Sequence, residues 1–330
     1  KRDPMVTVGR FVQTLFFAIL MGLFFWDMDQ SAAGVQDRLG FLFMCSMNTI
    51  FLAIMPGVAT FPPERAVFLM EQANESYSPW AYFMAKTLAE TPFQIFFPFM
   101  YITILYWMVG MVNTAEQFFI ALLIIVIASN VSFTFGLVAA SFFPTPEMGM
   151  AMVPLAILPM AIVGGLFANT DRLEPYWVWL NYLSFIRYVY KGLAVNEFEN
   201  IGSLCGDLLS GNSTDVNGTA VNGTAAAVSA CPWKDGHEVI KFLGFDKESD
   251  SWWFTVIALL IIMVGLRIIG GGVLAYQSST KTPKFAFHKN VGDRAMSPMR
   301  KEKFLAQASP AGVKHEDSDF TSPSNEAVAE

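Results

Sequence analysis

The chain has 330 residues, of which 54% are hydrophobic and only 15% are charged, and its formal net charge is −7. Soluble domains carry nearer a quarter charged residues, so this composition excludes an ordinary soluble globular protein. The chain also lacks a basic patch interleaved with aromatic residues, so nothing indicates a nucleic-acid partner. The apolar residues gather in long uninterrupted runs, which is typical of a membrane protein.

Six of these apolar runs are long enough to cross a membrane as helices, for which about 20 residues suffice. Two of them carry one arginine each towards one end, Arg10 and Arg267, where a long side chain can snorkel to the interface. The predicted spans are Val6–Trp26, Leu39–Val58, Thr91–Val112, Phe118–Phe143, Met148–Ala168 and Trp252–Tyr276. We therefore predict an all-α membrane protein with six transmembrane helices in residues 1–276, followed by a disordered polar tail in residues 277–330.

A polar segment, Phe61–Pro92, separates the second and third predicted spans. It combines charged residues with enough aromatic residues to lie against a membrane surface. We expect a turn, a short helix, a polar link and then the helix that enters the lipid. Such a segment would offer a binding element to a partner in the cytosol. The alternative is an ordinary loop between two spans.

The orientation follows from lysine and arginine residues in the short connections, which favour the cytosol. Arg65 and Lys86, in the segment Phe61–Pro92, and the basic start of the tail place this segment and both termini in the cytosol. Residues 168–250 then form a large extracellular loop. Three glycosylation sequons in this loop support the assignment, at Asn212, Asn217 and Asn222. We expect a multi-pass protein of the plasma membrane.

The first part of the outer loop is rich in aromatic residues, at Tyr176–Leu180 and Tyr182–Tyr190, which predicts short interfacial or re-entrant helices. Further on, Cys205 and Cys231 flank the sequons in an oxidising compartment. A disulfide between them would close a loop of about 27 residues and stabilise the fold by roughly 3.5 kcal/mol. The alternative is that one of the two cysteines links to a second subunit.

The sequence predicts no catalytic, cofactor or metal site. It contains no GxxxxGK[ST] loop to hold ATP, and its three histidines lack the spacing of metal ligands. Any use of ATP therefore requires machinery outside this chain. The chain opens on Lys1 without an initiator methionine, so we expect a fragment of a longer protein.

Polar side chains inside spans are the best candidates for a functional site. Asn48 lies in the middle of the second span, and Phe51 follows three residues later on the same helix face. They either line a pocket that offers one polar group among apolar walls, or Asn48 makes an interhelical hydrogen bond that holds the bundle together. Pro154 and Pro159 kink the fifth span and could frame a cavity or hinge.

Two motifs resemble the transmembrane domain of G-subfamily ABC transporters, of the White or pleiotropic-drug-resistance type. The first resembles the coupling segment of that family and comprises Pro63–Arg65, Phe68, Glu71, Tyr77, Tyr82, Lys86 and Pro92. The second begins at Gly164–Asn169 and continues through Pro175, Trp179, Tyr182, Ser184, Arg187–Tyr188 and Asn196–Phe198. The resemblance covers residues 1 to about 276 and includes the entry into the first span at Arg2–Pro4.

The resemblance implies a homodimer or heterodimer of such domains. Each domain would be joined to a nucleotide-binding domain that is absent from this chain and that binds ATP and Mg²⁺. Substrates of the family are lipids, sterols and amphipathic drugs, exported outward by alternating access. The alternative function is a passive lipid scramblase or a glycosylated membrane scaffold without ATP coupling.

The same resemblance assigns expected roles to individual residues. The substrate cavity is expected at Asn48, Phe51, Met44, Met47, Leu158 and Ala161. The extracellular gate is expected at Leu166 and Phe167, although the family often has two leucines there. Coupling to the nucleotide-binding domain is expected at Glu64, Arg65, Phe68 and Glu71.

Overall fold

The computed structural model describes residues 4–28, 34–73, 77–165, 175–199, 201, 233, 235–245 and 251–281. Residues 1–284 form one compact unit, and the second unit, residues 285–330, lies entirely outside the described residues. The regular structure within the described ranges is helical, with no β-strand. This confirms the predicted all-α class. The apolar helices make the chain an integral membrane protein.

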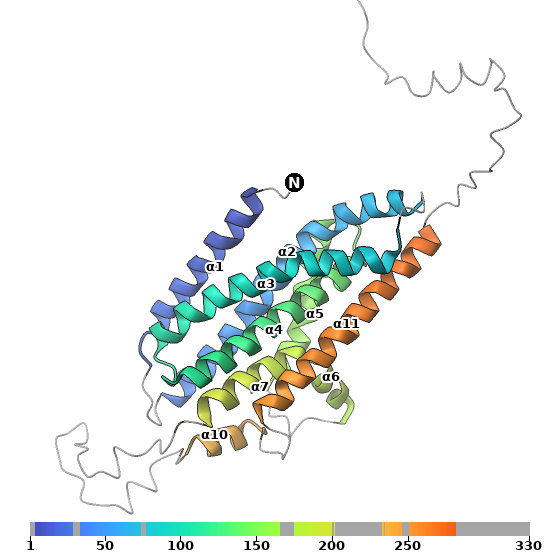
Figure 1. Cartoon of the computed structure of the whole chain (residues 1–330). Helices are drawn as coiled ribbons and strands as arrows, with labels where there is room; N and C mark the ends of the chain where they lie inside the picture. Colours follow the sequence, from blue (N-terminus) through green and yellow to red (C-terminus); the bar gives the residue numbers. More distant parts are fainter. Residues whose placement is uncertain are drawn as a thin grey trace, which may run out of the picture. The chain divides into compact units, whose positions relative to one another are not determined.

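Within the part of the chain that the structure describes, five helices are long and apolar enough to cross a membrane. They are α1 (Pro4–Phe24), α2 (Val35–Ala73), α3 (Pro79–Val109), α4 (Ala115–Ala140) and α11 (Trp252–Lys281), shown in Figure 1. Each contains most or all of one predicted span. The last helix continues past Tyr276 to Lys281, into residues that the sequence assigned to the tail.

The fifth predicted span, Met148–Ala168, corresponds to the shorter apolar helix α5, Pro146–Ile162. Thr145 caps its first turn by accepting a hydrogen bond from the Met148 N–H at 3.4 Å. With 17 residues α5 falls short of the length of about 20 that a full span needs. The count of six spans therefore stays a prediction.

The turn predicted at the start of Phe61–Pro92 was wrong, because α2 continues as one helix through Pro62 and Pro63 to Ala73. The reason is packing. Phe61 and Phe68 are seven residues apart, so they share one helix face, and both are buried. This face holds the helix against the bundle although the prolines remove backbone N–H donors.

The centre of the bundle is α4, which packs against α2, α3, α5, α11 and the short helix α7, Phe185–Phe198. Nearly every residue of α7 is buried. We call the end where α2 ends and α3 begins the hairpin end. The opposite end carries α7 and α10 (Gly236–Phe242), and we call it the α7 end (Figure 1). Between α5 and α7, the exposed aromatic residues Tyr176, Trp177 and Trp179 lie in a 3₁₀ turn and in α6, Val178–Leu183.

Candidate functional site

The first candidate site is an apolar surface on α2 and α5. One stripe of α5 is buried, and it contains Val153 and Ile157. The other faces of the same helix are exposed and apolar, as at Leu155 and Leu158. On α2, which packs against α5, Met44 is 48% exposed. An exposed face of this kind must be covered by lipid, by a second subunit or by a substrate.

Asn48 and Phe51 are half-buried on the same stretch of α2. The Asn48 Nδ2 donates a hydrogen bond to the hydroxyl oxygen of Tyr101, on α3, at 2.9 Å. The interhelical hydrogen bond that the sequence left open is therefore present. Ala161, which the sequence assigned to the cavity, is buried in the bundle. The roles of these residues in a substrate cavity stay predictions.

Sequence reasoning missed how many methionines share this region. Met44 and Met47 were expected there, and the structure adds further exposed or half-buried methionines on α2 and α5: Met55, Met148, Met150 and Met152. The alternating methionines after Pro146 were a visible signal. Methionine side chains are flexible and polarizable, so a surface rich in them adapts to ligands of different shape.

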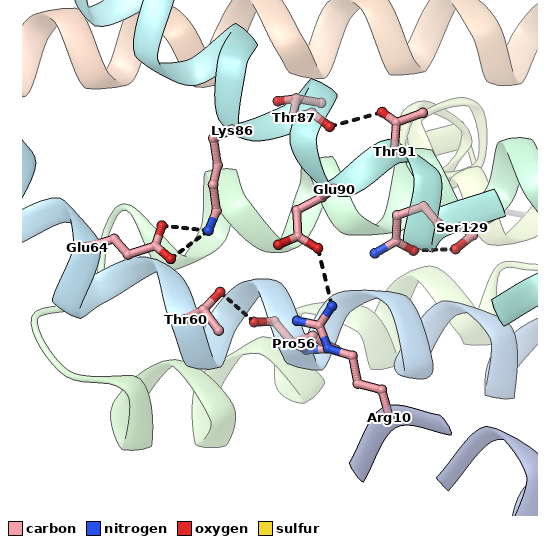
Figure 2. A network of polar contacts seen from close by, with 10 residues as sticks. Arg10, Pro56, Thr60, Glu64, Lys86, Thr87, Glu90, Thr91 and Ser129 are labelled. Atoms are coloured by element: carbon pink, nitrogen blue, oxygen red, sulfur yellow. Dashed lines mark hydrogen bonds and ion pairs between the residues drawn. The ribbon is translucent and has the colours of Figure 1, made fainter. Parts of the chain in front are cut away.

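A second candidate region is a polar network inside the bundle, near the hairpin end (Figure 2). The Arg10 Nη1 on α1 lies 3.2 Å from the Glu90 Oε2 on α3. The side chains are 14% and 4% exposed. Arg10 was expected to snorkel to the interface, and this was wrong. A buried carboxylate on the neighbouring helix offers a charge partner, so the guanidinium lies inside the bundle.

A cavity of about 30 Å³ adjoins this pair between α1, α2, α3 and α4. One of its walls is polar, because the Ser129 hydroxyl donates to the Gln94 Oε1 at 2.5 Å. The Arg10 Nε is buried and has no partner among the described residues. The volume suits a single water molecule and is far too small for an amphipathic compound.

At the hairpin end, all four predicted coupling residues make contacts within the chain. The Lys86 Nζ lies 2.5 Å from the Glu64 Oε2 (Figure 2). Arg65 donates to the backbone carbonyl of Ser141, just after α4. Phe68 is buried and stacks on the Tyr82 ring, with 4.6 Å between ring centroids.

Glu71 is the exposed member of the predicted coupling set. Its Oε2 accepts a hydrogen bond from the Tyr77 hydroxyl at 2.6 Å. Burial and this hydrogen bond to Glu71 raise the pKa of the Tyr77 hydroxyl to about 12, so it stays a donor at neutral pH. On the same part of α2, Val67 and Met70 are also exposed. The end of α2 therefore presents an apolar and acidic surface.

The α7 end contains a buried ion pair that the sequence did not reveal. Arg38 lies in the first turn of α2 and pairs with Glu197 on α7; both side chains are 1% exposed. The Arg38 Nη2 also donates to the carbonyl oxygens of Met28, at 2.7 Å, and Gly110, at 2.9 Å. Burial raises the pKa of Glu197, although Arg38 and the Val112 N–H oppose the shift.

Comparison with known proteins places this bundle in a family. The model of the ABC-2 type transporter family matches residues 1–198. The chain is 30% identical over 281 residues to the ABC transporter ATP-binding protein/permease wht-1 of Caenorhabditis elegans, covering 85% of this chain and 40% of that protein. It is 28% identical over 285 residues to ABC transporter G family member 1 of Dictyostelium discoideum, covering 85% and 34%. It is 29% identical over 267 residues to Protein white of Ceratitis capitata, covering 81% and 36%.

The chain belongs to the G subfamily of ABC transporters. This confirms the resemblance stated from the two sequence motifs. The chain spans 40% or less of the length of these three relatives. The bundle is a transporter membrane domain.

Several predicted residues of the G-subfamily domain lie outside the described residues. They are the gate residues Leu166 and Phe167, the cysteines Cys205 and Cys231, and the sequon asparagines Asn212, Asn217 and Asn222. Among the described residues, no group of three or more His, Cys, Asp or Glu side chains could hold a metal ion.

Proposed function

We propose that this chain is the membrane half of an ATP-driven exporter that moves lipids, sterols or amphipathic xenobiotics outward by alternating access. The observation that carries the proposal is the exposed, methionine-rich surface on α2 and α5. In a dimer, two such surfaces face each other across the two-fold axis and enclose a substrate. Apolar walls that contain methionine favour amphipathic molecules of varied shape.

Within this proposal, Asn48 supplies the polar group at the edge of the apolar walls. Its Nδ2 is bound to Tyr101, so its side-chain oxygen is the group that a substrate hydroxyl or amide would meet. Met44 and Leu158 are the exposed apolar contacts on the two helices. The polar cavity beside Arg10 is too small for a substrate, so it is not part of the proposed substrate site.

The nucleotide-binding domain docks on the end of α2 in this proposal. Val67, Met70 and Glu71 are exposed there and form the contact surface. The ion pair of Glu64 and the buried ring of Phe68 keep this part of α2 on α3. Movement of the nucleotide-binding domain would then be passed to the spans through a stiff helical hairpin.

The experiment uses the full-length protein, purified as a dimer and reconstituted in proteoliposomes with fluorescent phospholipid, fluorescent sterol or an amphipathic dye. We expect ATP-dependent movement of at least one probe and stimulation of ATP hydrolysis by that probe. The matched pair of variants is Met70→Asp, which disturbs the docking surface, and Val8→Asn, a lipid-facing change on α1. Met70→Asp should abolish the stimulation, and Val8→Asn should preserve it.

Movement of fluorescent phospholipid without ATP would instead identify a passive scramblase. Absence of movement for every probe, with intact ATP hydrolysis and folding, would overturn the export proposal. Equal stimulation in Met70→Asp and the wild type would overturn the docking surface alone.

A further inference from the structure

Arg187 is a cationic side chain of the bundle whose charge no described residue neutralises. It lies in the first turn of α7 and is half-buried. Its Nε is buried and has no hydrogen-bond partner among the described residues. These residues offer its guanidinium the Tyr182 ring, whose centroid lies 6.0 Å from the Arg187 Cζ. An aromatic ring attracts a cation weakly at this distance and leaves the guanidinium N–H donors unsatisfied.

The contacts of α7 place Arg187 near the middle of the membrane. At the other end of the helix, the Glu197 carboxylate accepts from the Val112 N–H, in the connection between α3 and α4. Arg187 lies ten residues before Glu197, so it is about 15 Å from that connection along the helix. This distance is half of a hydrocarbon core of about 30 Å.

Arg187 is also level with Asn48, the polar group of the proposed substrate site. The Tyr190 ring contacts the Phe43 ring, with 5.7 Å between their centroids. The end of α7 pairs with the start of α2, so the two helices run in opposite directions. Going back three residues from Tyr190 to Arg187 therefore leads about 4.5 Å towards the hairpin end. This is within about one turn of Asn48 on α2.

The helix turns Arg187 away from the centre of the bundle. The Phe185 ring contacts the Phe135 ring of α4, with 5.5 Å between centroids, and Asn196 donates to the Gln117 carbonyl of α4. These two residues of α7 are about three turns apart, so they share the face towards α4. Arg187 follows Phe185 by two residues, a rotation of about 200°. It therefore lies on the opposite face, where the described part of the chain leaves it half-exposed.

The break between α6 and α7 holds this cation beside the exposed surface of α5. The Ser184 hydroxyl donates to the Met160 carbonyl of α5 at 2.8 Å and accepts from the Arg187 N–H at 3.4 Å. Leu158 and Ile162 lie two residues to either side of Met160, and both are exposed. One hydroxyl group thus joins a charged group to the apolar surface of the proposed substrate site.

A second polar group near this break is unsatisfied. Asn181, on α6, is 5% exposed, and its Oδ1 has no hydrogen-bond partner among the described residues. Asn181 and Arg187 each lie three residues from Ser184, one on either side. Buried polar groups are normally hydrogen-bonded, so both side chains indicate a ligand that carries polar atoms.

The depth of Arg187 limits what this ligand can be. A guanidinium in the middle of a membrane costs free energy unless an anion meets it. A resident phospholipid keeps its phosphate at the headgroup level, roughly 15 Å away. A second copy of the chain offers no suitable carboxylate among the described residues, because Glu90 and Glu197 form ion pairs and the others lie near helix ends or in the hairpin. A molecule that enters the site must therefore supply the anion.

We propose that Arg187 binds the anionic group of the transported molecule, and that this chain moves amphipaths with a sulfate or carboxylate in preference to neutral ones. The guanidinium donates two parallel hydrogen bonds to two oxygens of the anion. The apolar part of the molecule lies along Leu158 and Ile162. This inference rests on the proposed export function, of which it names the substrate class.

The test compares two probes that differ in charge, a pyrene-labelled alkyl sulfate and its parent alcohol. The full-length protein is purified as a dimer. One readout is equilibrium binding without ATP, counted by native mass spectrometry, and the other is ATP-dependent movement in proteoliposomes. We expect the wild type to bind and move the sulfate at an about tenfold lower concentration than the alcohol, the effect of one charge-assisted hydrogen bond.

The variants separate the charge of Arg187 from other effects. Arg187→Gln should raise the half-saturating concentration of the sulfate to that of the alcohol and leave the alcohol unchanged. Arg187→Lys keeps the charge but loses the planar fork, so it should retain part of the preference. The control is Arg267→Gln, which removes the same charge about 18 Å along α11 from Thr255, where α11 contacts Gly192 of α7. It should leave the preference for the sulfate unchanged.

Three results would overturn the inference. The first is equal binding of sulfate and alcohol by the wild type, which leaves the export proposal intact if either probe moves with ATP. The second is an equal loss of preference in Arg187→Gln and Arg267→Gln. The third is dissociation of the Arg187→Gln dimer with an unchanged preference for the sulfate, which would assign Arg187 to a subunit contact. Selective binding of the sulfate without movement of either probe would support the anion site and overturn export alone.

Discussion

The ion pair between Arg38 and Glu197 yields a quantitative prediction. Replacing Glu197 by alanine removes its carboxylate from the buried Arg38 guanidinium, which also donates to the carbonyl oxygens of Met28 and Gly110. It also leaves the Val112 N–H without the carboxylate oxygen that now accepts from it at 3.3 Å. Breaking a buried pair by removing one partner costs about 3–5 kcal/mol. We therefore expect Glu197→Ala to lower the apparent unfolding temperature by roughly 10 °C.

The assay follows tryptophan fluorescence of the full-length protein in nanodiscs during heating. The matched variant is the double change Arg38→Met with Glu197→Met, which removes both charges and keeps apolar volume. Because the net contribution of a buried ion pair to folding stability is small, this variant should recover much of the lost stability. A fall of less than about 2 °C in Glu197→Ala would refute the reasoning. A double variant that is less stable than both single variants together would also refute it.

Three further predictions concern packing and pH. Gly271→Ala should lower the free energy of unfolding by about 1–3 kcal/mol, because its Cβ would lie 2.4 Å from the Trp80 ring. Gly272→Ala should leave it unchanged, because a Cβ there would have nothing within 4 Å. Equal thermal unfolding of the two variants would contradict this prediction. Phe68→Ala should cost about 3–5 kcal/mol and expose the hairpin end to limited proteolysis, and an unchanged digestion pattern would argue against its packing role. Burial raises the pKa of Glu197 above 4.5, so folding favours the protonated carboxyl; this stabilisation is complete below 4.5 and is lost as pH rises through the raised pKa. The unfolding temperature of the wild type relative to Glu197→Gln should therefore rise as pH falls from 7 towards 4.5, and a constant difference would contradict the assignment.

The long helices were predictable because the length of an apolar run reports directly on the medium that surrounds it. The continuation of α2 past Pro62 was not predictable, because a pair of prolines commonly marks a turn. The burial of Phe61 and Phe68 against the bundle favours a continuous helix over a turn at this point. Local chemistry favoured one conformation there and tertiary packing selected another.

The polar contacts were beyond the reach of the sequence for a different reason. Arg10 and Glu90 are 80 residues apart in the chain, and Arg38 and Glu197 are 159 apart. A single sequence gives no distance between such residues. Arg10 was therefore assigned to the interface by its chemistry alone. Asn48 was the exception, because an amide within an apolar run already indicates a hydrogen-bond partner on another helix.

The long sequence separation of Arg38 and Glu197 has a consequence for biosynthesis. Ribosomes add about 5–20 residues per second, so roughly 8 to 32 s pass between synthesis of the arginine and of its glutamate. During this interval α1 and α2 are synthesised without the Glu197 carboxylate that pairs with Arg38. The ion pair between α2 and α7 can form only once α7 has been synthesised. A chain interrupted before Glu197 would therefore lack this link between α2 and α7.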